Sequence, residues 1–178
     1  MPKDRLPEIA FVGRSNVGKS SLVNMFLQRR SIARISSTPG KTQEINFFRI
    51  NDRFYVVDLP GFGYARVSKS QRKHWQQLIG RYVLERETLS VVFQLIDSRH
   101  EPTELDREVM LLLKESPASH VILLSKSDKL SGNGRTQSRR RMEECLDSLL
   151  LEVPVIMTSA KKGSGRNEIV QWVNTLLG

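Results

Sequence analysis

The sequence predicts an α/β fold built on a mostly parallel β-sheet. Short apolar runs alternate with longer amphipathic segments along the chain, in the order β-α-β-β-α-β-α-β-α-β-α. Such alternation places helices on both faces of a sheet. The one direct β-β step predicts a single antiparallel strand. The length of 178 residues suits one domain, which we expect to span residues 1–178.

The first half of the chain opens with a short apolar run that ends at a glycine, which predicts a buried strand followed by a turn and a helix. The next two runs are separated by Asn51-Asp52-Arg53, which is typical of a hairpin. We expect strands at Ile9–Val12, Ile45–Ile50 and Phe54–Asp58, helices at Lys19–Gln28 and Ser70–Glu87, and loops at Ser31–Gln43 and Pro60–Ser68.

The second half repeats strand and helix three times. Thr103 is a good N-cap for the helix that ends near Glu115. Ser131–Gly134 contains two glycines, so we expect a loop there. The remaining elements are expected as strands at Leu89–Ile96, Val121–Leu124 and Val153–Met157, and as helices at Thr136–Leu150 and Asn167–Leu177.

Charge is the unusual property of the composition. Lys and Arg number 28 against 19 Asp and Glu, which gives a net charge of +9. The basic residues gather in two acid-free stretches, Arg66–Arg81 and Arg135–Arg141. Each stretch alone can be a solvated surface, but together with the net charge they favour an RNA or ribosome partner. Neither stretch has the apolar face of a membrane-binding helix, so we expect no membrane partner.

A single cysteine, Cys145, excludes an internal disulfide and a cysteine-cluster metal site. The N-terminus lacks the apolar run of a signal peptide, and no apolar stretch approaches the roughly 18 residues that span a bilayer. We therefore expect a cytoplasmic protein, and a monomer.

A phosphate-binding loop follows the first expected strand. Gly13-Arg14-Ser15-Asn16-Val17-Gly18-Lys19-Ser20 matches G-x-x-x-x-G-K-[ST], with an apolar strand before it and a helix after it. In such loops the backbone N–H groups and the helix N-terminus face phosphate oxygens. Lys19 is expected to reach the terminal phosphates and the Ser20 hydroxyl to bind Mg²⁺.

Later segments indicate that the nucleotide carries guanine. Asp58-Leu59-Pro60-Gly61 fits D-x-x-G, whose carboxylate holds Mg²⁺ through water and whose glycine N–H contacts the γ-phosphate. Thr42 offers a second hydroxyl to the metal. Ser125-Lys126-Ser127-Asp128 is similar to [NT]-K-x-D, in which the Asp carboxylate accepts hydrogen bonds from guanine N1–H and N2–H₂.

These segments resemble the translation-factor-related GTPases and, more closely, the EngB (YihA-like) family of bacterial ribosome-assembly GTPases. The resemblance covers nearly the whole chain and rests on Gly13–Ser21 (GRSNVGKSS), Ser37–Gln43 (STPGKTQ), Asp58–Tyr64 (DLPGFGY), Asp97–Asp106 (DSRHEPTELD), Ser125–Asp128 and Ser159–Lys161. It implies a three-layer P-loop GTPase fold with six strands and five helices, GTP hydrolysis, and a role in large-subunit assembly that affects growth, division and septation.

The resemblance also implies a set of site residues. Lys19, Thr42 and Gly61 are expected to act in catalysis, and Ser20, Thr42 and Asp58 to hold Mg²⁺. The residues expected to bind GTP or GDP are Gly13, Arg14, Ser15, Asn16, Val17, Gly18, Lys19, Ser20, Ser21, Gly40, Lys41, Thr42, Asp58, Gly61, Ser125, Lys126, Asp128, Ser159, Ala160 and Lys161.

Three positions distinguish this chain. Position 125 is Ser where the family usually has Thr or Asn, and the hydroxyl is kept. Phe62 follows D-x-x-G, where many GTPases have a Gln that orients water, so we expect slow intrinsic hydrolysis. Asn16 stands where related GTPases bind potassium, which makes K⁺ a candidate cofactor.

Two other functions remain open from the sequence. The chain can be an RNA-binding scaffold that uses nucleotide for stability with negligible turnover, which Phe62 and the net charge favour. A small-molecule phosphotransferase is the third interpretation, and it does not account for Asp128 and Ser159–Lys161 as base-reading residues.

Overall fold

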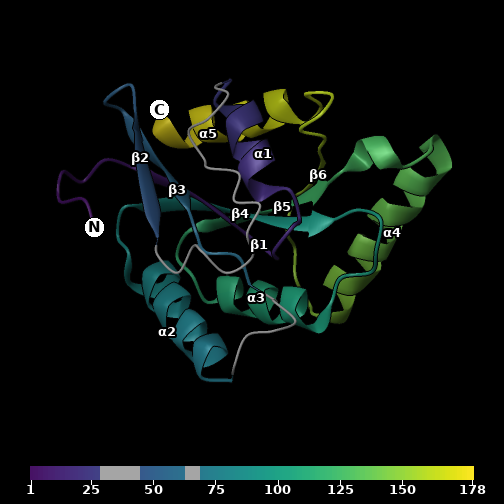
Figure 1. The fold of residues 1–178 in the computed structure, drawn as a ribbon, viewed down its shortest axis with the longest axis horizontal. Coiled ribbons are helices and arrows are strands. Elements are labelled where there is room, and N and C mark those ends of the chain that lie inside the picture. Colours follow the sequence, from purple (N-terminus) through teal and green to yellow (C-terminus); the bar gives the residue numbers. More distant parts are fainter. Residues whose placement is uncertain (29–44, 63–68) are drawn as a thin grey trace.

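A computed structural model describes residues 1–28, 45–62 and 69–178, apart from the side chains of residues 69–72 and 74. Six strands form one sheet in the order β2-β3-β1-β4-β5-β6 (Figure 1). Strand β2 runs antiparallel to β3, and every other pair is parallel. The strands are β1 (Glu8–Gly13), β2 (Asn46–Ile50), β3 (Phe54–Asp58), β4 (Leu89–Asp97), β5 (Ser119–Ser125) and β6 (Val155–Met157).

Five helices cover the two faces of the sheet, which confirms the three-layer prediction. They are α1 (Lys19–Phe26), α2 (Lys69–Glu85), α3 (Glu104–Lys114), α4 (Gly132–Ser148) and α5 (Arg166–Leu177). Helices α1 and α5 pack on one face, and α2, α3 and α4 lie on the other (Figure 1).

Alternation along β1 shows why both faces are covered. Ile9 and Phe11 join the cluster under α1 and α5, whereas Ala10 and Val12 join the cluster under α2 and α3. All four side chains are fully buried. A strand that is apolar on both sides must lie between two helical layers, since successive side chains point to opposite faces.

The cap predicted at Thr103 is present. Its hydroxyl accepts a hydrogen bond from the Asp106 N–H at 3.3 Å, while the Asp106 carboxylate accepts one from the Thr103 N–H at 2.9 Å. This reciprocal pair is a capping box, which satisfies two N–H groups at the start of α3.

The loop predicted at Ser131–Gly134 is wrong. Helix α4 begins at Gly132, and Ser131 is its N-cap, accepting a hydrogen bond from the Gly134 N–H at 3.1 Å. The cap outweighs the low helix propensity of the two glycines. The short 3₁₀ turn Ser127–Lys129 was not predicted.

The sheet order creates a crevice at the carboxyl ends of β1 and β4. The chain leaves β1 toward β3 on one side and leaves β4 toward β5 on the other. Ligands of open α/β sheets bind at such a switch point. The loops that follow β1 and β4 therefore flank the expected binding site. No helix in the described ranges is both long and apolar enough to cross a membrane.

His120 in β5 is expected to make the fold sensitive to mild acid. Neither ring nitrogen has a hydrogen-bond partner in the described part, and burial lowers the pKa of His120 to about 4 from its usual 6.5. The unfolded chain takes up a proton below pH 6.5, which the folded chain resists until about pH 4. The free energy of unfolding should therefore fall by about 3 kcal/mol between these pH values.

Urea unfolding at several pH values measures this contribution. His120→Leu should remove most of the slope between pH 6.5 and 4, because leucine does not titrate. If the free energy of unfolding depended on pH in the same way in the wild type and in His120→Leu, the prediction would be contradicted.

Candidate functional site

The phosphate loop joins β1 to α1 at the crevice. Gly18 precedes the helix with φ of 98°, a left-handed conformation that favours glycine, and no side chain in the described part caps the helix at this residue. Asn16 is also left-handed, with φ of 63°. The N–H groups of the first turn of α1 are therefore left for an anion, which is what a phosphate loop requires.

The phosphate loop meets the D-x-x-G segment through a buried ion pair. The Lys19 ammonium donates a hydrogen bond to the Asp58 carboxylate, and each side chain is 10% exposed. Lys19 comes from the start of α1 and Asp58 from the end of β3. The structure thus brings together two residues that sequence analysis assigned separately to phosphate and metal.

The residues present suit Mg²⁺. Asp58 provides a carboxylate, and Ser20, next to Lys19, provides a hydroxyl, both hard oxygen ligands of the kind that Mg²⁺ takes. No group of three His, Cys, Asp or Glu side chains in the described ranges forms a metal cage. A site with few protein ligands is consistent with Mg²⁺, which usually keeps waters and binds substrate phosphates.

The D-x-x-G segment continues beside the phosphate loop, where Phe62 forms an isolated parallel β-bridge with Arg14. The Ser15 N–H donates to the Phe62 carbonyl at 2.9 Å, and the Phe62 N–H donates to the Gly13 carbonyl at 3.3 Å. A Cβ on Gly61 would lie 3.5 Å from the Ser15 nitrogen, so the backbone of Gly61 runs against the loop.

The side chain of Phe62 belongs to the core. It is 5% exposed, and its ring centroid lies 5.1 Å from that of Trp75 in α2. The Trp75 indole N–H donates to the Pro60 carbonyl at 2.7 Å, which fixes the segment from the other side. Phe62 therefore fills a packing position and supplies no hydrogen bond to water.

The segment after β5 is tied to the phosphate loop. The Ser125 hydroxyl bonds to the Val17 carbonyl at 2.8 Å and to the Ile96 carbonyl at 3.2 Å. The Lys126 ammonium donates to the Asn16 carbonyl at 2.7 Å. The Ser125 hydroxyl therefore joins the segment after β5 to the phosphate loop.

Asp128 and Ser159 meet at the expected guanine position. The Ser159 hydroxyl donates to the Asp128 carboxylate at 2.6 Å, and this bond lowers the pKa of Asp128. The Ser159 hydroxyl also accepts from the Lys162 N–H at 3.2 Å. Asp128 is therefore an ionised acceptor at neutral pH, held by the segment that contains Ala160 and Lys161.

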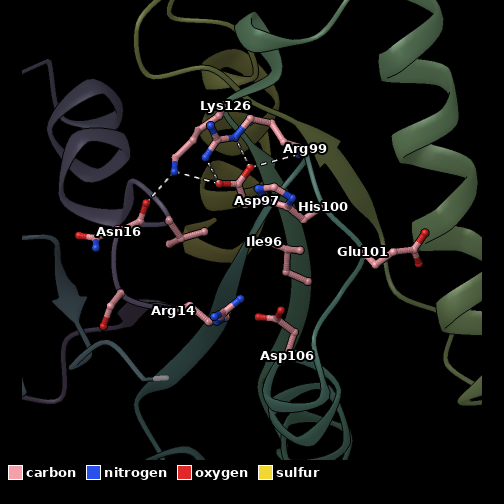
Figure 2. Close-up of a pocket in the computed structure, with 11 residues that line it drawn as sticks. Arg14, Asn16, Ile96, Asp97, Arg99, His100, Glu101, Asp106 and Lys126 are labelled. Atoms are coloured by element: carbon pink, nitrogen blue, oxygen red, sulfur yellow. Dashed lines mark hydrogen bonds and ion pairs between the residues drawn. The ribbon is translucent and has the colours of Figure 1, made fainter. Parts of the chain in front are cut away.

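Asp97 is a site residue to which sequence analysis assigned no role. Its carboxylate accepts hydrogen bonds from Lys126 at 2.9 Å and from two Arg99 nitrogens at 2.8 and 2.9 Å (Figure 2). Burial alone would raise the pKa of Asp97, but these bonds outweigh it and hold that pKa far below its usual range. Its place at the end of β4, opposite the phosphate loop, was the available signal.

Removing this charge should weaken nucleotide binding. Asp97→Asn is expected to lower GDP affinity about tenfold, because Lys126 loses a charge-assisted bond that holds it over the Asn16 carbonyl. Fluorescent GDP titration measures the effect. Arg99→Ala is the control and should change affinity less than about twofold, since Arg99 bonds only to Asp97 among the described residues.

A double substitution separates this role from general damage. In a Lys126→Met background, Asp97→Asn should lower GDP affinity no further, because both changes remove the same hydrogen bond between Asp97 and Lys126. Additive losses would contradict the assignment.

The side chains of two predicted residues in the described part of the chain make none of these contacts between loops. Ser21 is exposed on α1, and the Val17 side chain is buried in the core. Gly40, Lys41 and Thr42 lie outside the described residues, as do Arg66 and the side chains of Lys69 and Arg72.

Two arginines of the basic stretch on α4 are hydrogen-bonded to other parts of the protein. Arg135 donates to the Ser127 carbonyl at 3.1 Å, and Arg141 donates to the Ser98 carbonyl at 3.3 Å. Arg140 pairs with Glu144 at 2.9 Å on the surface. Arg135 and Arg141 therefore contact the segments after β5 and β4, whereas Arg139 and Arg140 are exposed on α4.

Sequence comparison agrees with this geometry. Residues 8–126 match the family model described as 50S ribosome-binding GTPase. The chain is 45% identical over 179 residues to the probable GTP-binding protein EngB of Prosthecochloris aestuarii, covering 100% of this chain and 91% of the relative. It is 44% identical over 177 residues to the protein of the same name from Pelotomaculum thermopropionicum, covering 99% and 89%.

Solved structures share the fold. A crystal structure of a probable GTP-binding protein engB superposes with a TM-score of 0.79 at 20% identity, covering 96% of this chain and 98% of that one. Era in complex with MgGDPNP and nucleotides 1506–1542 of 16S ribosomal RNA superposes with a TM-score of 0.73 at 20% identity, covering 96% and 56%. With a family model over most of the chain and relatives near 45% identity over its full length, the chain belongs to the EngB family of 50S ribosome-binding GTPases.

Proposed function

We propose that residues 1–178 form a single GTP-binding domain that hydrolyses GTP to GDP and phosphate as a switch in assembly of the large ribosomal subunit. The junction of four loops at the carboxyl ends of β1, β3, β5 and β6 carries this proposal. Lys19 meets Asp58, Lys126 meets the Asn16 carbonyl, and the loop after β6 meets Asp128 through Ser159. One nucleotide can then touch phosphate, metal and base-reading groups at once.

The nucleotide contacts follow from this junction. The backbone from Gly13 to Ser21 and the Lys19 ammonium would hold the phosphates, and Asp128 would accept hydrogen bonds from guanine. Ser20 and Asp58 would hold Mg²⁺, which neutralises charge on the β- and γ-phosphates when bound. Thr42 would add a hydroxyl to the metal, with Gly40, Lys41 and the Gly61 N–H near the γ-phosphate.

Slow intrinsic turnover is part of the proposal. Phe62 is packed in the core, so no side chain at that position orients water. We place a potassium ion beside Asn16 in the active state, where it would offset charge as an arginine finger does. Hydrolysis should then be faster in potassium than in sodium at equal ionic strength.

The large ribosomal subunit is the proposed partner. The family model names 50S binding, Era of similar fold is complexed with ribosomal RNA, and this chain carries a net charge of +9. A cytoplasmic monomer that acts on the large subunit would affect growth, cell division and septation when lost.

Phosphate release with and without purified 50S subunits tests the proposal. We expect slow release from the protein alone and faster release with 50S. The core position of Phe62 favours one alternative, an RNA-binding scaffold with negligible turnover. Undetectable release in both conditions, with 50S binding retained, would support the scaffold and contradict the GTPase switch.

Surface charge variants test the partner. Lys69→Ala, Arg72→Ala and Lys73→Ala combined should weaken 50S binding and flatten its salt dependence, since each phosphate contact adds about 0.7–0.9 to the slope of log affinity against log salt. Arg139→Ala with Arg140→Ala tests α4 without touching Arg141, which holds the Ser98 carbonyl. Unchanged binding in both variants would contradict an electrostatic RNA contact.

A further inference from the structure

A group of exposed cations surrounds the loops that hold Asp128. The segments Ser127–Arg141 and Ser159–Asn167 contain eight Lys or Arg residues and one carboxylate, that of Asp128. Five of the eight cations are exposed and form no ion pair with any described residue. We call these five the base-side surface, which consists of Lys129, Arg135, Arg139, Lys161 and Lys162. Their charge is therefore not neutralised within the described part of the protein.

The two loops that carry the lysines of this surface are joined at Asp128. The Ser159 hydroxyl donates to the Asp128 carboxylate at 2.6 Å, and this bond is the main cause of the lowered pKa of Asp128. The charges of Lys129 and Lys161 lower that pKa further, so both lysines lie near the carboxylate. Lys162 follows in the same loop, where its N–H donates to the Ser159 hydroxyl at 3.2 Å. The lysines of both loops therefore gather around one carboxylate.

Helix α4 extends the surface. Arg135 donates to the Ser127 carbonyl at 3.1 Å, which places it beside the turn Ser127–Lys129. Arg139 lies one helical turn further along, on the same side of α4. Figure 1 shows α4 beside β6, at the edge of the sheet opposite β2. The base-side surface therefore runs from the loop after β6 along the first half of α4.

The charges of α4 oppose the helix dipole. A helix is stabilised by acidic residues in its first turn and by basic residues in its last turn. The first turn of α4 has no acidic residue and contains Arg135, whereas the last turn has no basic residue and contains Asp147. A local sequence that disfavours its own element is expected at functional sites, which favours a role for these cations in binding a partner.

The chemistry of the surface suits phosphates. Guanidinium and ammonium groups bind phosphate oxygens through charge-assisted hydrogen bonds. The segments Ser127–Arg141 and Ser159–Asn167 contain no Phe, Tyr, Trp or His, so they offer no aromatic ring on which a base could stack. Contacts to phosphates position a nucleic acid without reading its sequence. We therefore expect binding without base preference.

We propose that the base-side surface binds the phosphate backbone of RNA equally in the GTP state and in the GDP state. The proposal rests on the proposed RNA partner and adds a contact site to it. GTP and GDP differ at the γ-phosphate, whose proposed contacts come from the loops after β1 and β3. Strand β4 separates β1 from β5, and the surface lies beyond it, at the loops after β5 and β6 and on α4. The guanine next to the surface is the same in both nucleotides, so this contact anchors the protein on RNA before and after hydrolysis.

The informative variant combines Lys129→Gln, Arg139→Gln and Lys162→Gln. Each substitution removes a charge from an exposed side chain and keeps most of its length. Arg135 is kept because it is hydrogen-bonded to the turn after β5. Lys161 is kept because it belongs to the expected nucleotide-binding residues. The variant therefore changes the surface without changing the nucleotide site.

The matched control combines Lys3→Gln, Arg53→Gln and Lys114→Gln. These three residues are exposed and lie outside the two segments. Arg53 lies between β2 and β3, at the edge of the sheet opposite β6. Both variants lose three positive charges, so a difference between them comes from position and not from net charge. The melting temperatures of both should stay within a few degrees of that of the wild type.

Fluorescence anisotropy with a labelled oligouridylate measures RNA binding by the full chain, saturated with GDP or with a non-hydrolysable GTP analogue. The base-side variant should bind about tenfold more weakly than the wild type at low salt. Its slope of log affinity against log salt should fall by about 2, because each phosphate contact of a single strand adds about 0.7. The control variant should bind within about twofold of the wild type. The ratio of wild-type to base-side-variant affinity should be the same with either nucleotide.

Three results would overturn the inference. Equal losses of affinity in the base-side variant and in the control would show that only net charge matters. A labelled oligoglutamate carries carboxylates in place of phosphates, and a larger loss of its binding than of oligouridylate binding would show that the surface fits an acidic protein. A ratio of affinities that differs between the two nucleotides would show that the surface belongs to the switch.

Co-sedimentation and phosphate release separate this inference from the proposed function. If the base-side variant binds oligouridylate as the wild type does, while the wild type pellets with 50S in GTP, this surface is wrong and the proposed function stands. If the wild type releases no phosphate from GTP, but the base-side variant binds oligouridylate more weakly than the control, the proposed function fails and the RNA surface stands.

Discussion

Asp128→Asn is expected to lower GTP affinity by about 100-fold or more, because the amide replaces an ionised carboxylate that accepts from guanine N1–H and N2–H₂. Charge-assisted hydrogen bonds contribute about 1.5–3 kcal/mol each, and two are lost. Xanthosine triphosphate, which carries an acceptor in place of N2–H₂, should bind the variant more tightly than it binds the wild type. Competition against a fluorescent nucleotide measures both affinities.

The same variant should fold normally. The Ser159 hydroxyl now donates a hydrogen bond to the Asp128 carboxylate, and the amide oxygen of the variant can accept the same bond. The melting temperature is therefore the control and should stay within a few degrees. Unchanged GTP affinity in a folded variant would show that Asp128 does not read the base.

Gly165→Ala is expected to be the most destabilising small substitution near the site. Gly165 is the N-cap of α5 and has φ of 81°, and an added Cβ would lie 2.6 Å from both the Met157 carbonyl oxygen and the Thr158 Cγ2. The left-handed backbone and the clash together should lower the free energy of unfolding by about 3 kcal/mol. Because Thr158 precedes Ser159, GDP affinity should fall as well.

Gly163→Ala separates the two causes. Gly163 also has a left-handed backbone, with φ of 71°, but its Cβ would meet nothing within 4 Å. Gly163→Ala should lower the free energy of unfolding by only about 1 kcal/mol and leave GDP affinity unchanged. Chemical denaturation of both variants tests this, and equal losses of stability would show that the clash at Gly165 is relieved without cost.

The fold was predictable because its signals are local. Runs such as that of β1 are apolar on both sides, which requires two helical layers, and the Asn51-Asp52-Arg53 turn indicated the antiparallel strand. The phosphate loop was predictable for the same reason, since strand, glycines and helix are contiguous in the sequence.

The contacts between loops could not be predicted in this way. Asp97 is 29 residues from Lys126, and only the sheet order places the end of β4 beside the loop after β1. The pairing of Lys19 with Asp58 spans 39 residues for the same reason. Arg141 looked like part of an RNA surface, but the fold turns it toward the Ser98 carbonyl. In each case the sequence showed that the residue is charged, but only the sheet topology showed which residue it contacts.

Co-sedimentation with 50S subunits in GTP, GDP and a non-hydrolysable GTP analogue tests the central claim most directly. A nucleotide switch on the large subunit predicts that the protein pellets with 50S more strongly in GTP and in the analogue than in GDP, and that Asp128→Asn loses this difference until xanthine nucleotides are supplied. Equal pelleting in all three nucleotides, or none in any of them, would contradict it.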